Sequence, residues 1–369
     1  MESIFKNLLL KESLIDLFVN DVKRKDFPIA LFGCGNALQY AFSFLELKNL
    51  RPAILIDNNE KIIGTKINDL MVHSFDCFMQ MRGDFVVLIV PQNLIIIDQI
   101  KDQLAGIISS QNVYSFDFIH FMIYNQIQTE KTFKAFAEKN IDSLIWLYNN
   151  LEDEKSKETL IGFISGRITS DYHYYNKIFV KDNYFVEGIV SLSAEEVFID
   201  CGAFNGDTIH EFIKRTKSYR EIHAFEADVS NFKLLESYII GNSIPNISVY
   251  NKAVWNKKTT ITFNTAGDML SRVCCDGFVT VQAVALDDII NDPVTHIKMD
   301  IEGAEYEALE GAITIIATYK PKLTVCVYHK YEDITRIPLL IKKIEPEYKL
   351  FLRHHMPCGA ELILYAIPR

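Results

Sequence analysis

The sequence lacks the features that mark a membrane, nucleic-acid-binding or disulfide-rich protein. No apolar run approaches the roughly 18 residues that a membrane span needs, and residues 1–17 mix Lys and Glu with apolar positions, unlike a signal peptide. Basic residues number 38 against 48 acidic ones and form no run, which argues against nucleic acid as the main partner. The seven cysteines include no Cys-x-x-Cys pattern, so we expect reduced thiols and a cytoplasmic protein.

Apolar residues, by contrast, are plentiful, at 49% of 369 positions. At about 150 residues per domain, this length predicts two to three domains. Strand-like and helical segments alternate, which predicts the α/β class with doubly wound parallel sheets. We expect a Rossmann-like domain over 1–120, a helical and aromatic connecting segment over 121–195, and a second α/β domain over 196–369.

The first 120 residues predict a complete small α/β unit. A helix is expected over 1–26, and a glycine loop, Gly33-Cys34-Gly35-Asn36, follows the first strand. Asp57 lies where a ribose-binding acid would be, but Leu38 replaces the third glycine of the dinucleotide motif. A structural domain, a nucleotide-sugar or small-ligand site, and a nicotinamide site all stay open. The expected strands are 29–32, 53–56, 85–90 and 112–116.

The connecting segment combines helical periodicity with aromatic residues. Helices are expected over 130–150 and 152–166, and aromatic side chains are frequent between Tyr172 and Phe185. These aromatics can simply pack against the next domain. Alternatively, Tyr184 and Phe185 form a lid over a ligand bound to the domain that follows.

A strand, a glycine loop and a helix are expected over 197–213. The loop has the spacing Asp-x-Gly-x-x-x-Gly, from Asp200 to Gly206, and this unit lets backbone N–H groups approach a nucleotide closely. About 20 residues later, a second strand ends in Glu226, which can accept hydrogen bonds from both hydroxyls of a ribose.

Polar residues end four successive core strands of this domain, namely Asp200, Glu226, Asp300 and His329. Ligands of open α/β sheets bind beyond the carboxyl ends of the strands, so we expect these four side chains to converge on one crevice. The last two strands, 348–352 and 361–366, are joined by a short loop and must therefore be antiparallel. Strands 259–263 and 278–284 are expected to pair in the same way around Gly267.

Five segments in this order closely resemble the FkbM-type S-adenosylmethionine-dependent methyltransferases. The resemblance covers roughly 180–369 and implies a seven-stranded class I methyltransferase fold. It also implies an enzyme that methylates a hydroxyl of a sugar or natural product. The segments are Val-Phe-Ile-Asp-Cys-Gly-Ala-Phe-Asn-Gly-Asp-Thr, Ala-Phe-Glu-Ala, Lys-Ala-Val-Trp, Leu-Asp-Asp-Ile and Ile-Lys-Met-Asp-Ile-Glu-Gly-Ala-Glu-Tyr-Glu-Ala-Leu-Glu-Gly-Ala.

The resemblance also implies a cofactor site. Asp200, Gly202 and Gly206 would line the methionine and ribose, Glu226 would hold the ribose hydroxyls, and Ala253 and Val254 would lie near the adenine. Ala227 replaces the family's usual proline, which leaves the Glu226 assignment intact. The full predicted S-adenosylmethionine set is Asp200, Cys201, Gly202, Ala203, Phe204, Asn205, Gly206, Asp207, Thr208, Glu226, Ala227, Ala253, Val254, Asp300 and Tyr184.

The acceptor hydroxyl must lose a proton, so a base within reach helps the reaction. His329 is the candidate, because an unperturbed pKa of about 6.5 suits this task. Residues 300–303 should turn into a helix that runs through Ile316, and Glu305 on this helix should face the sheet. Lys298 should pair with the acidic residues that follow its strand or touch the substrate. We therefore predict the catalytic set His329, Asp300, Lys298, Glu302 and Glu305. No metal is predicted, since Asp300, Glu302 and His329 would suit magnesium or manganese only moderately.

These observations predict an S-adenosylmethionine-dependent O-methyltransferase that acts on a saccharide or small-molecule acceptor by in-line displacement, in a chain that can form a homo-oligomer. Two alternatives stay open. One is a nucleotide-sugar-binding or scaffold protein with an inert methyltransferase fold. The other is a nicotinamide-dependent oxidoreductase that uses the loop from Gly33 to Gly35.

Overall fold

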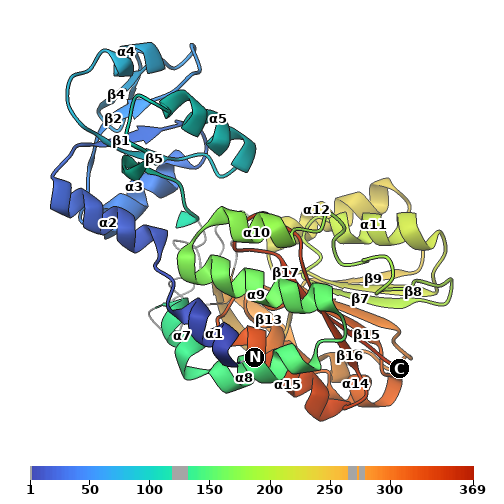
Figure 1. Cartoon of the computed structure of the whole chain (residues 1–369). Coiled ribbons are helices and arrows are strands. Elements are labelled where there is room, and N and C mark those ends of the chain that lie inside the picture. Colours follow the sequence, from blue (N-terminus) through green and yellow to red (C-terminus); the bar gives the residue numbers. More distant parts are fainter. Residues whose placement is uncertain (1, 119–131, 265–271, 274–278) are drawn as a thin grey trace. The chain divides into compact units, whose positions relative to one another are not determined.

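The computed structural model describes residues 2–118, 132–264, 272–273 and 279–369. The chain forms two compact units (Figure 1). The N-terminal unit comprises Met1–Glu138, Ile161–Ile178 and Pro357–Gly359, and the C-terminal unit comprises Lys139–Leu160, Phe179–Met356 and Ala360–Arg369. The predicted connecting segment is thus divided between them.

The N-terminal unit contains a six-stranded sheet in the order β3-β4-β2-β1-β5-β6. The four expected strands are confirmed and are parallel to one another, whereas the β3–β4 hairpin was not predicted. The expected helix over 1–26 is wrong, because the chain leaves the helical conformation before Ser13, and two helices form. The strands are β1 (Ile29–Phe32), β2 (Pro52–Ile56), β3 (Lys66–Ile67), β4 (Leu70–His73), β5 (Val86–Ile89) and β6 (Val113–Tyr114).

Helices complete the N-terminal unit. Leu38, which replaces the motif's third glycine, is 4% exposed and packs into this unit's core with Phe44 and Leu88. The helical elements are α1 (Glu2–Leu9), α2 (Leu14–Lys25), α3 (Leu38–Leu47), α4 (Phe75–Met79), α5 (Leu94–Leu104), η1 (Ser110–Asn112), α7 (Phe133–Lys139) and α10 (Tyr172–Ile178). The expected helix start at Glu130 lies outside the described residues, and beyond it Asn140 separates α7 from the next helix.

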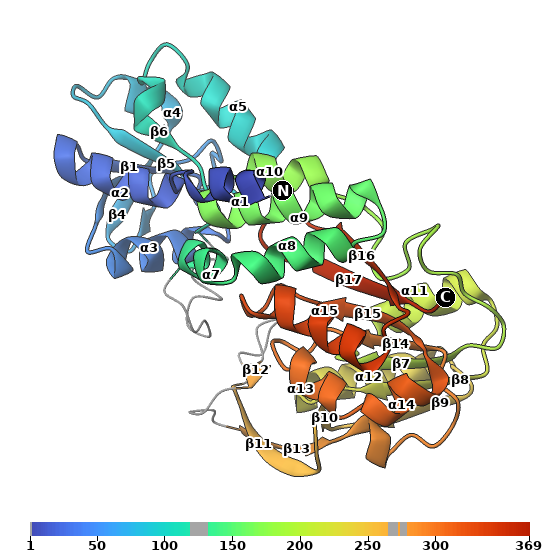
Figure 2. The ribbon, with the colours of Figure 1, turned by 60° about the horizontal axis from the view of Figure 1, so that its bottom comes forward.

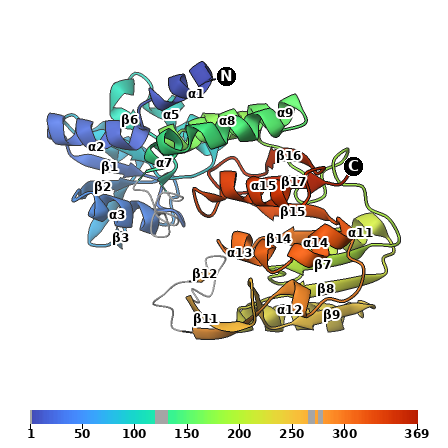
Figure 3. The same cartoon turned by 90° about the horizontal axis from the view of Figure 1, so that it is seen from below.

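The C-terminal unit is built on a seven-stranded sheet in the order β16-β17-β15-β14-β7-β8-β9, which can be followed from top to bottom in Figure 3. All neighbours are parallel except β17, which runs antiparallel to both β15 and β16. This confirms the expected fold and its antiparallel end. The strands are β7 (Val197–Cys201), β8 (Glu221–Phe225), β9 (Ile247–Tyr250), β14 (His296–Met299), β15 (Lys322–Cys326), β16 (Lys349–His354) and β17 (Leu362–Ile367).

Helices cover both faces of this sheet. In Figure 1, α11 (Asp207–Thr216) and α12 (Val229–Gly241) lie above it, and α14 (Ile313–Tyr319) and α15 (Asp333–Ile344) lie below it. The strand order reverses between β7 and β14, and such a switch point is where open α/β sheets bind ligands. The single helix expected after Gly303 is divided into α13 (Glu305–Glu310) and α14.

A second, four-stranded sheet in the order β10-β13-β11-β12 belongs to the same unit (Figure 2). The expected antiparallel pairing of β11 with β13 is confirmed, while the loop around Gly267 lies outside the described residues. Its strands are β10 (Ala253–Val254), β11 (Thr259–Asn264), β12 (Arg272–Val273) and β13 (Val279–Val284), and η3 (Leu286–Asp288) follows them.

The outermost strand of the large sheet, β16, is covered along its free side. The N–H of Glu152 donates to the carbonyl of Leu350 (3.0 Å), just before α9 (Glu154–Thr169) and just after α8 (Ile141–Asn150). The N–H of Leu352 donates to Oγ of Ser156 (2.9 Å), and the N–H of Val180 donates to the carbonyl of His354 (2.8 Å). Glu152, Ser156 and Val180 thus occupy hydrogen-bonding groups that an edge strand would expose.

Across the ranges that the structure describes, none of the helices combines the length and the apolar character that crossing a membrane requires.

Candidate functional site

The glycine loop after β7 is held tightly against the neighbouring strand. Gly202 has φ +84°, and a Cβ atom at this position would overlap the backbone carbonyl oxygen of Asp300. Gly206 has φ +92° and lies against the ring of Tyr238. Glycine is required at Gly202 on both grounds, because the left-handed conformation disfavours side chains and the approach leaves no space for one. The loop is therefore fixed at the switch point between β7 and β14.

Glu226 ties this loop to the end of β8. Its Oε2 accepts a hydrogen bond from the N–H of Phe204 (2.9 Å), and its Oε1 accepts one from the N–H of Asp228 (2.8 Å). The side chain is 8% exposed, and burial raises its pKa to about 7 although both N–H groups favour the ionised form. Each carboxylate oxygen keeps a second lone pair, so Glu226 can also accept hydrogen bonds from a diol.

Asp200 and Lys298 form a fully buried ion pair across β7 and β14, with Nζ 3.0 Å from Oδ1 of Asp200. Nζ also donates to the carbonyl of Gly202 (2.7 Å). Burial raises the pKa of Asp200 to about 6, and Lys298 opposes this shift. The ion-pair partner of Lys298 is thus Asp200, which is completely buried, and not one of the acidic residues after β14.

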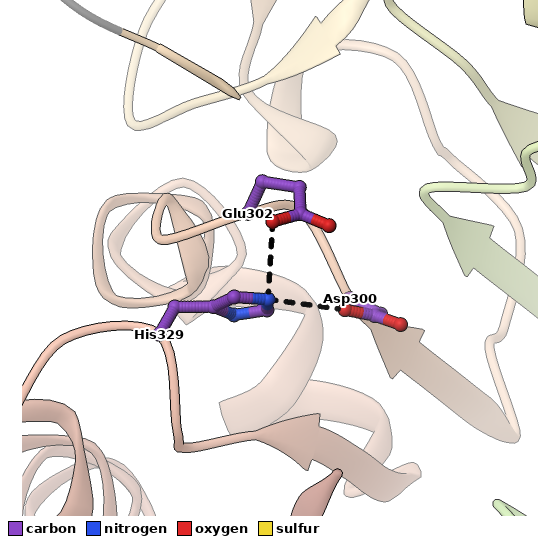
Figure 4. A group of neighbouring side chains, drawn as sticks. All are labelled: Asp300, Glu302 and His329. Carbon is purple, nitrogen blue, oxygen red and sulfur yellow. Dashed lines mark ion pairs between the residues drawn. The ribbon is translucent and has the colours of Figure 1, made fainter. Parts of the chain in front are cut away.

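Four titratable residues meet at the ends of β14 and β15; we call Asp300, Glu302, Glu305 and His329 the acid–histidine cluster. Nε2 of His329 faces Oδ1 of Asp300 at 3.6 Å and Oε2 of Glu302 at 3.4 Å (Figure 4). Nδ1, on the other side of the ring, lies 3.0 Å from Oε1 of Glu305. His329 and Glu305 are completely buried, which confirms that Glu305 faces inward.

The charges in this cluster are strongly coupled. Burial disfavours the imidazolium form of His329, but Glu305, Glu302 and Asp300 outweigh burial and raise its pKa to about 10. Burial also raises the pKa of Glu302, to about 8, against the opposing charge of His329. The unperturbed pKa that the sequence analysis assumed for His329 therefore does not apply in the folded protein. At neutral pH both ring nitrogens are protonated and the ring is an imidazolium.

Tyr184 reaches this cluster and Phe185 does not. The hydroxyl of Tyr184 donates to Oδ2 of Asp300 (2.6 Å), and the Nζ of Lys298 lies 5.1 Å from the centre of the Tyr184 ring. Phe185 is 2% exposed and packs against Phe198 in the core. Of the two residues proposed as a lid, only Tyr184 lies at the site.

The remaining predicted cofactor residues lie at the end of β7, in the glycine loop, at the start of α11, just after β8 and in β10. Cys201 and Ala203 are completely buried, whereas Asn205 and Asp207 are exposed. Sequence reasoning missed Glu361, whose pKa burial raises to about 7 and whose Oε1 accepts a hydrogen bond from the hydroxyl of Tyr328 (3.1 Å). Its position directly before the last strand was the available signal. Predicted members that are partly or largely buried are Gly202, Phe204, Gly206, Thr208, Ala227, Ala253 and Val254.

The N-terminal unit has a cavity of its own, of about 430 Å³, where β1, β2 and β5 end. Asp57 lines it, and its two carboxylate oxygens accept backbone hydrogen bonds from Cys34 (2.6 Å) and Asn59 (2.7 Å), as those of Glu226 do in the other unit. The lining contains two aspartates and no Lys or Arg, which disfavours a diphosphate ligand such as a nicotinamide cofactor or a nucleotide sugar. It consists of Phe32, Gly33, Asp57, Asn58, Pro91, Ile96, Gln99, Ile100, Asp102 and Gln103.

Comparison with solved structures concerns the fold. The methyltransferase FkbM from Methylobacillus flagellatus KT is 23% identical, covers 99% of this chain and 97% of its own, and superimposes with a TM-score of 0.79, which shows a shared fold. Two further structures give a TM-score of only 0.32. One is an rRNA methylase from Streptococcus thermophilus, which is 11% identical and covers 54% of this chain and 94% of its own. The other is a precorrin-6y C5,15-methyltransferase from Geobacter metallireducens GS-15, which is 10% identical and covers 53% of this chain and 96% of its own. No curated protein matches the sequence.

The Methyltransferase FkbM domain matches residues 200–348, a range that contains the glycine loop, Glu226 and the acid–histidine cluster. Over these residues, the chain matches the FkbM methyltransferase domain family.

Proposed function

We propose that the C-terminal unit transfers the methyl group of S-adenosylmethionine to a hydroxyl group of a sugar or natural product. One observation carries this proposal: Glu226 is fixed to the glycine loop beside the switch point of the sheet. Its carboxylate is positioned to accept hydrogen bonds from the two ribose hydroxyls of the cofactor. The family match over 200–348 supports the same reaction class.

The charge of the site suits this cofactor. The methyl donor is a sulfonium cation, and the acidic side chains of Glu226 and Asp300 end two strands of the same sheet. Methyl transfer is an in-line displacement, so holding donor and acceptor in line provides much of the acceleration. We place the acceptor hydroxyl beside Asp300, Glu302 and His329, where the side chains of both carboxylates are partly exposed.

Loss of the hydroxyl proton is the step that the acid–histidine cluster would assist. His329 can accept that proton only after releasing the one that Glu305, Glu302 and Asp300 hold on its ring. A role for His329 as a simple neutral base therefore requires a change in the cluster when ligands bind.

The cofactor assignment is tested by calorimetric titration of the full chain with S-adenosylhomocysteine, the demethylated product. We expect Glu226→Ala to weaken binding by at least about tenfold, because it removes the acceptor of both ribose hydroxyls. The matched control is Asp57→Ala, which removes the corresponding acid of the N-terminal unit and should leave the affinity unchanged. Equal affinity in wild type and Glu226→Ala would refute the ribose assignment.

The role of the cluster is tested by separating cofactor binding from turnover. We expect His329→Ala to bind S-adenosylhomocysteine like the wild type but to lose methyl transfer to an acceptor found by screening hydroxylated saccharides and natural products. Undiminished methyl transfer in His329→Ala would exclude a chemical role for this residue.

A further inference from the structure

The distances within the acid–histidine cluster are unusual for hydrogen bonds. Nε2 of His329 is 3.6 Å from Asp300 and 3.4 Å from Glu302, longer than the roughly 2.7–2.9 Å of a charge-assisted hydrogen bond. Three atoms, one from each residue, lie within 4.8 Å of one another. Ligand atoms about 2.1 Å from a common metal ion lie about 3.0–3.4 Å apart at octahedral or tetrahedral angles. The separation of 3.4 Å falls within this range and that of 3.6 Å lies just above it, so both are nearer to the spacing of ligands around one ion than to direct hydrogen bonds.

Glu305 orients His329 for such a role. Its Oε1 lies 3.0 Å from Nδ1, and the same oxygen accepts a hydrogen bond from the N–H of Ile301 (2.9 Å). A carboxylate behind a histidine that binds metal through its other nitrogen is the usual arrangement, because it fixes the tautomer and the ring orientation. Glu305 is completely buried, and its second oxygen has no hydrogen-bond partner among the described residues.

The cluster also has a deficit of positive charge. Three carboxylates meet a single histidine there, and the nearby ammonium group of Lys298 is already paired with Asp200. The site is not sealed, since the side chains of Asp300 and Glu302 are 20% and 25% exposed, so an ion and a substrate oxygen could both reach it.

We propose that Asp300, Glu302 and His329 bind a divalent cation of the Mg²⁺ or Mn²⁺ class, with Glu305 as the positioning residue of His329. Two carboxylates favour these hard ions, and the imidazole shifts the preference toward Mn²⁺. This site would revise the expectation, from sequence, that no metal is bound.

A neighbouring set of residues competes for the same ion. Asp300 also lies close to Cys326 and Glu361. Burial raises the pKa of the Cys326 thiol, so it stays protonated, and Glu361 is already held by Tyr328. Neither has an orienting carboxylate like Glu305, so we assign the site to the set with His329.

The role of the ion rests on the proposed function. Bound to the acceptor oxygen, the cation would lower the pKa of that hydroxyl. The proton leaves to water, the O–CH₃ bond forms as the S–CH₃ bond breaks, and the electron pair of the broken bond stays on sulfur. His329 then acts as a ligand of the ion and not as the base.

The test is a titration of the full chain with MnCl₂ alone, in which electron paramagnetic resonance measures free Mn²⁺. We expect one Mn²⁺ per wild-type chain and at least tenfold weaker binding in Glu302→Gln. For Glu305→Gln, which touches no metal, we expect affinity to fall about 10- to 100-fold. The matched control is Glu361→Gln, which removes a nearby buried carboxylate of the competing set and should bind like the wild type.

Circular dichroism and calorimetry with S-adenosylhomocysteine show whether each variant is folded. The absence of a stoichiometric Mn²⁺ site in the wild type would overturn the proposal, as would equal affinity in wild type and Glu302→Gln. Loss of Mn²⁺ in Glu361→Gln but not in Glu302→Gln would assign the ion to the competing set and also overturn it. Cofactor binding without Mn²⁺ binding refutes only the metal site, whereas Mn²⁺ binding without cofactor binding refutes only the proposed function.

Discussion

The two units of the chain build nearly the same turn from different residues. In each, a glycine after the first strand donates its N–H to the strand beside it, Gly33 to Ile56 (2.8 Å) and Gly202 to Phe225 (2.9 Å). In each, the acid after that neighbouring strand accepts one N–H from the glycine loop and another from two residues beyond itself. Glu226 is one methylene longer than Asp57 and bonds one residue further along its loop. This turn is therefore a structural device in both units.

The units differ in the pair of side chains at the strand position two residues before the glycine. The residue two positions before the glycine is Leu31 in the N-terminal unit and faces Leu88, both completely buried. The corresponding position in the C-terminal unit is Asp200, which faces Lys298. A buried ion pair is weak evidence for stability, because desolvation offsets much of the attraction. We infer that the C-terminal pair is retained for the glycine loop, whose carbonyl at Gly202 it holds.

The largest expected effect comes from breaking this ion pair. Lys298→Leu leaves the Asp200 carboxylate buried and unpaired, and we expect a loss of about 3–5 kcal/mol in the free energy of unfolding, measured by urea denaturation. Asp200→Leu combined with Lys298→Leu copies the N-terminal pair and should recover most of this loss while still binding S-adenosylhomocysteine weakly. If the double variant is as unstable as Lys298→Leu, an apolar pair like Leu31 and Leu88 cannot replace the ion pair in the C-terminal unit.

A smaller effect separates the glycines of the two loops. Gly202→Ala must adopt φ +84° and overlap Asp300, so we expect at least about 2 kcal/mol of destabilisation in the same measurement. The control is Gly35→Ala, where no atom lies within 4 Å of the added Cβ, and which should stay within about 0.5 kcal/mol of the wild type. Similar values for the two substitutions would contradict this account of the C-terminal loop.

The smallest effect concerns pH. Burial raises the pKa of Glu226 to about 7, so the ligand-free side chain is mostly protonated below that pH and accepts hydrogen bonds poorly. We expect the affinity for S-adenosylhomocysteine to fall as pH drops below 7, by up to about tenfold per unit, and to level off above about 8. For folding the sign is opposite, since this group stabilises the fold at low pH and loses that contribution as pH rises from about 4.5 through 7.

Calorimetry at several pH values measures this dependence. Glu226→Gln has no charge to lose, so its affinity should vary much less with pH. If the variant and the wild type show the same pH profile, another group titrates on binding.

The sequence predicted the fold because its signals are local. Apolar runs bounded by glycine and acidic residues located every strand of the large sheet, and the short loop before β17 required an antiparallel end. Signals that depend on tertiary contacts were missed. The helix expected after Gly303 is interrupted near Gly311, where the backbone of Trp255 comes so close that a Cβ would overlap it. Helix α15 contains Pro338, which hides it from a search for uninterrupted periodicity.

The residues that form the acid–histidine cluster were all named from the sequence, but their charges were not. Strand ends brought Asp300, Glu302, Glu305 and His329 to one place, as expected from parallel topology. Which acid faces which base depends on side-chain directions, so the partner of Lys298 was wrong. The pKa of His329 depends on burial and on three carboxylates acting together, and neither follows from spacing along the chain.

The covering of β16 has a consequence for where the methyltransferase part can be cut from the chain. A polypeptide that begins at residue 196 would keep all seven strands but lose the backbone and hydroxyl partners supplied by Glu152, Ser156 and Val180. Its outer strand would then offer unpaired N–H and C=O groups to any other copy, which is the starting point of edge-to-edge aggregation. These three residues, all of the C-terminal unit, thus protect the edge of the sheet from pairing with further strands.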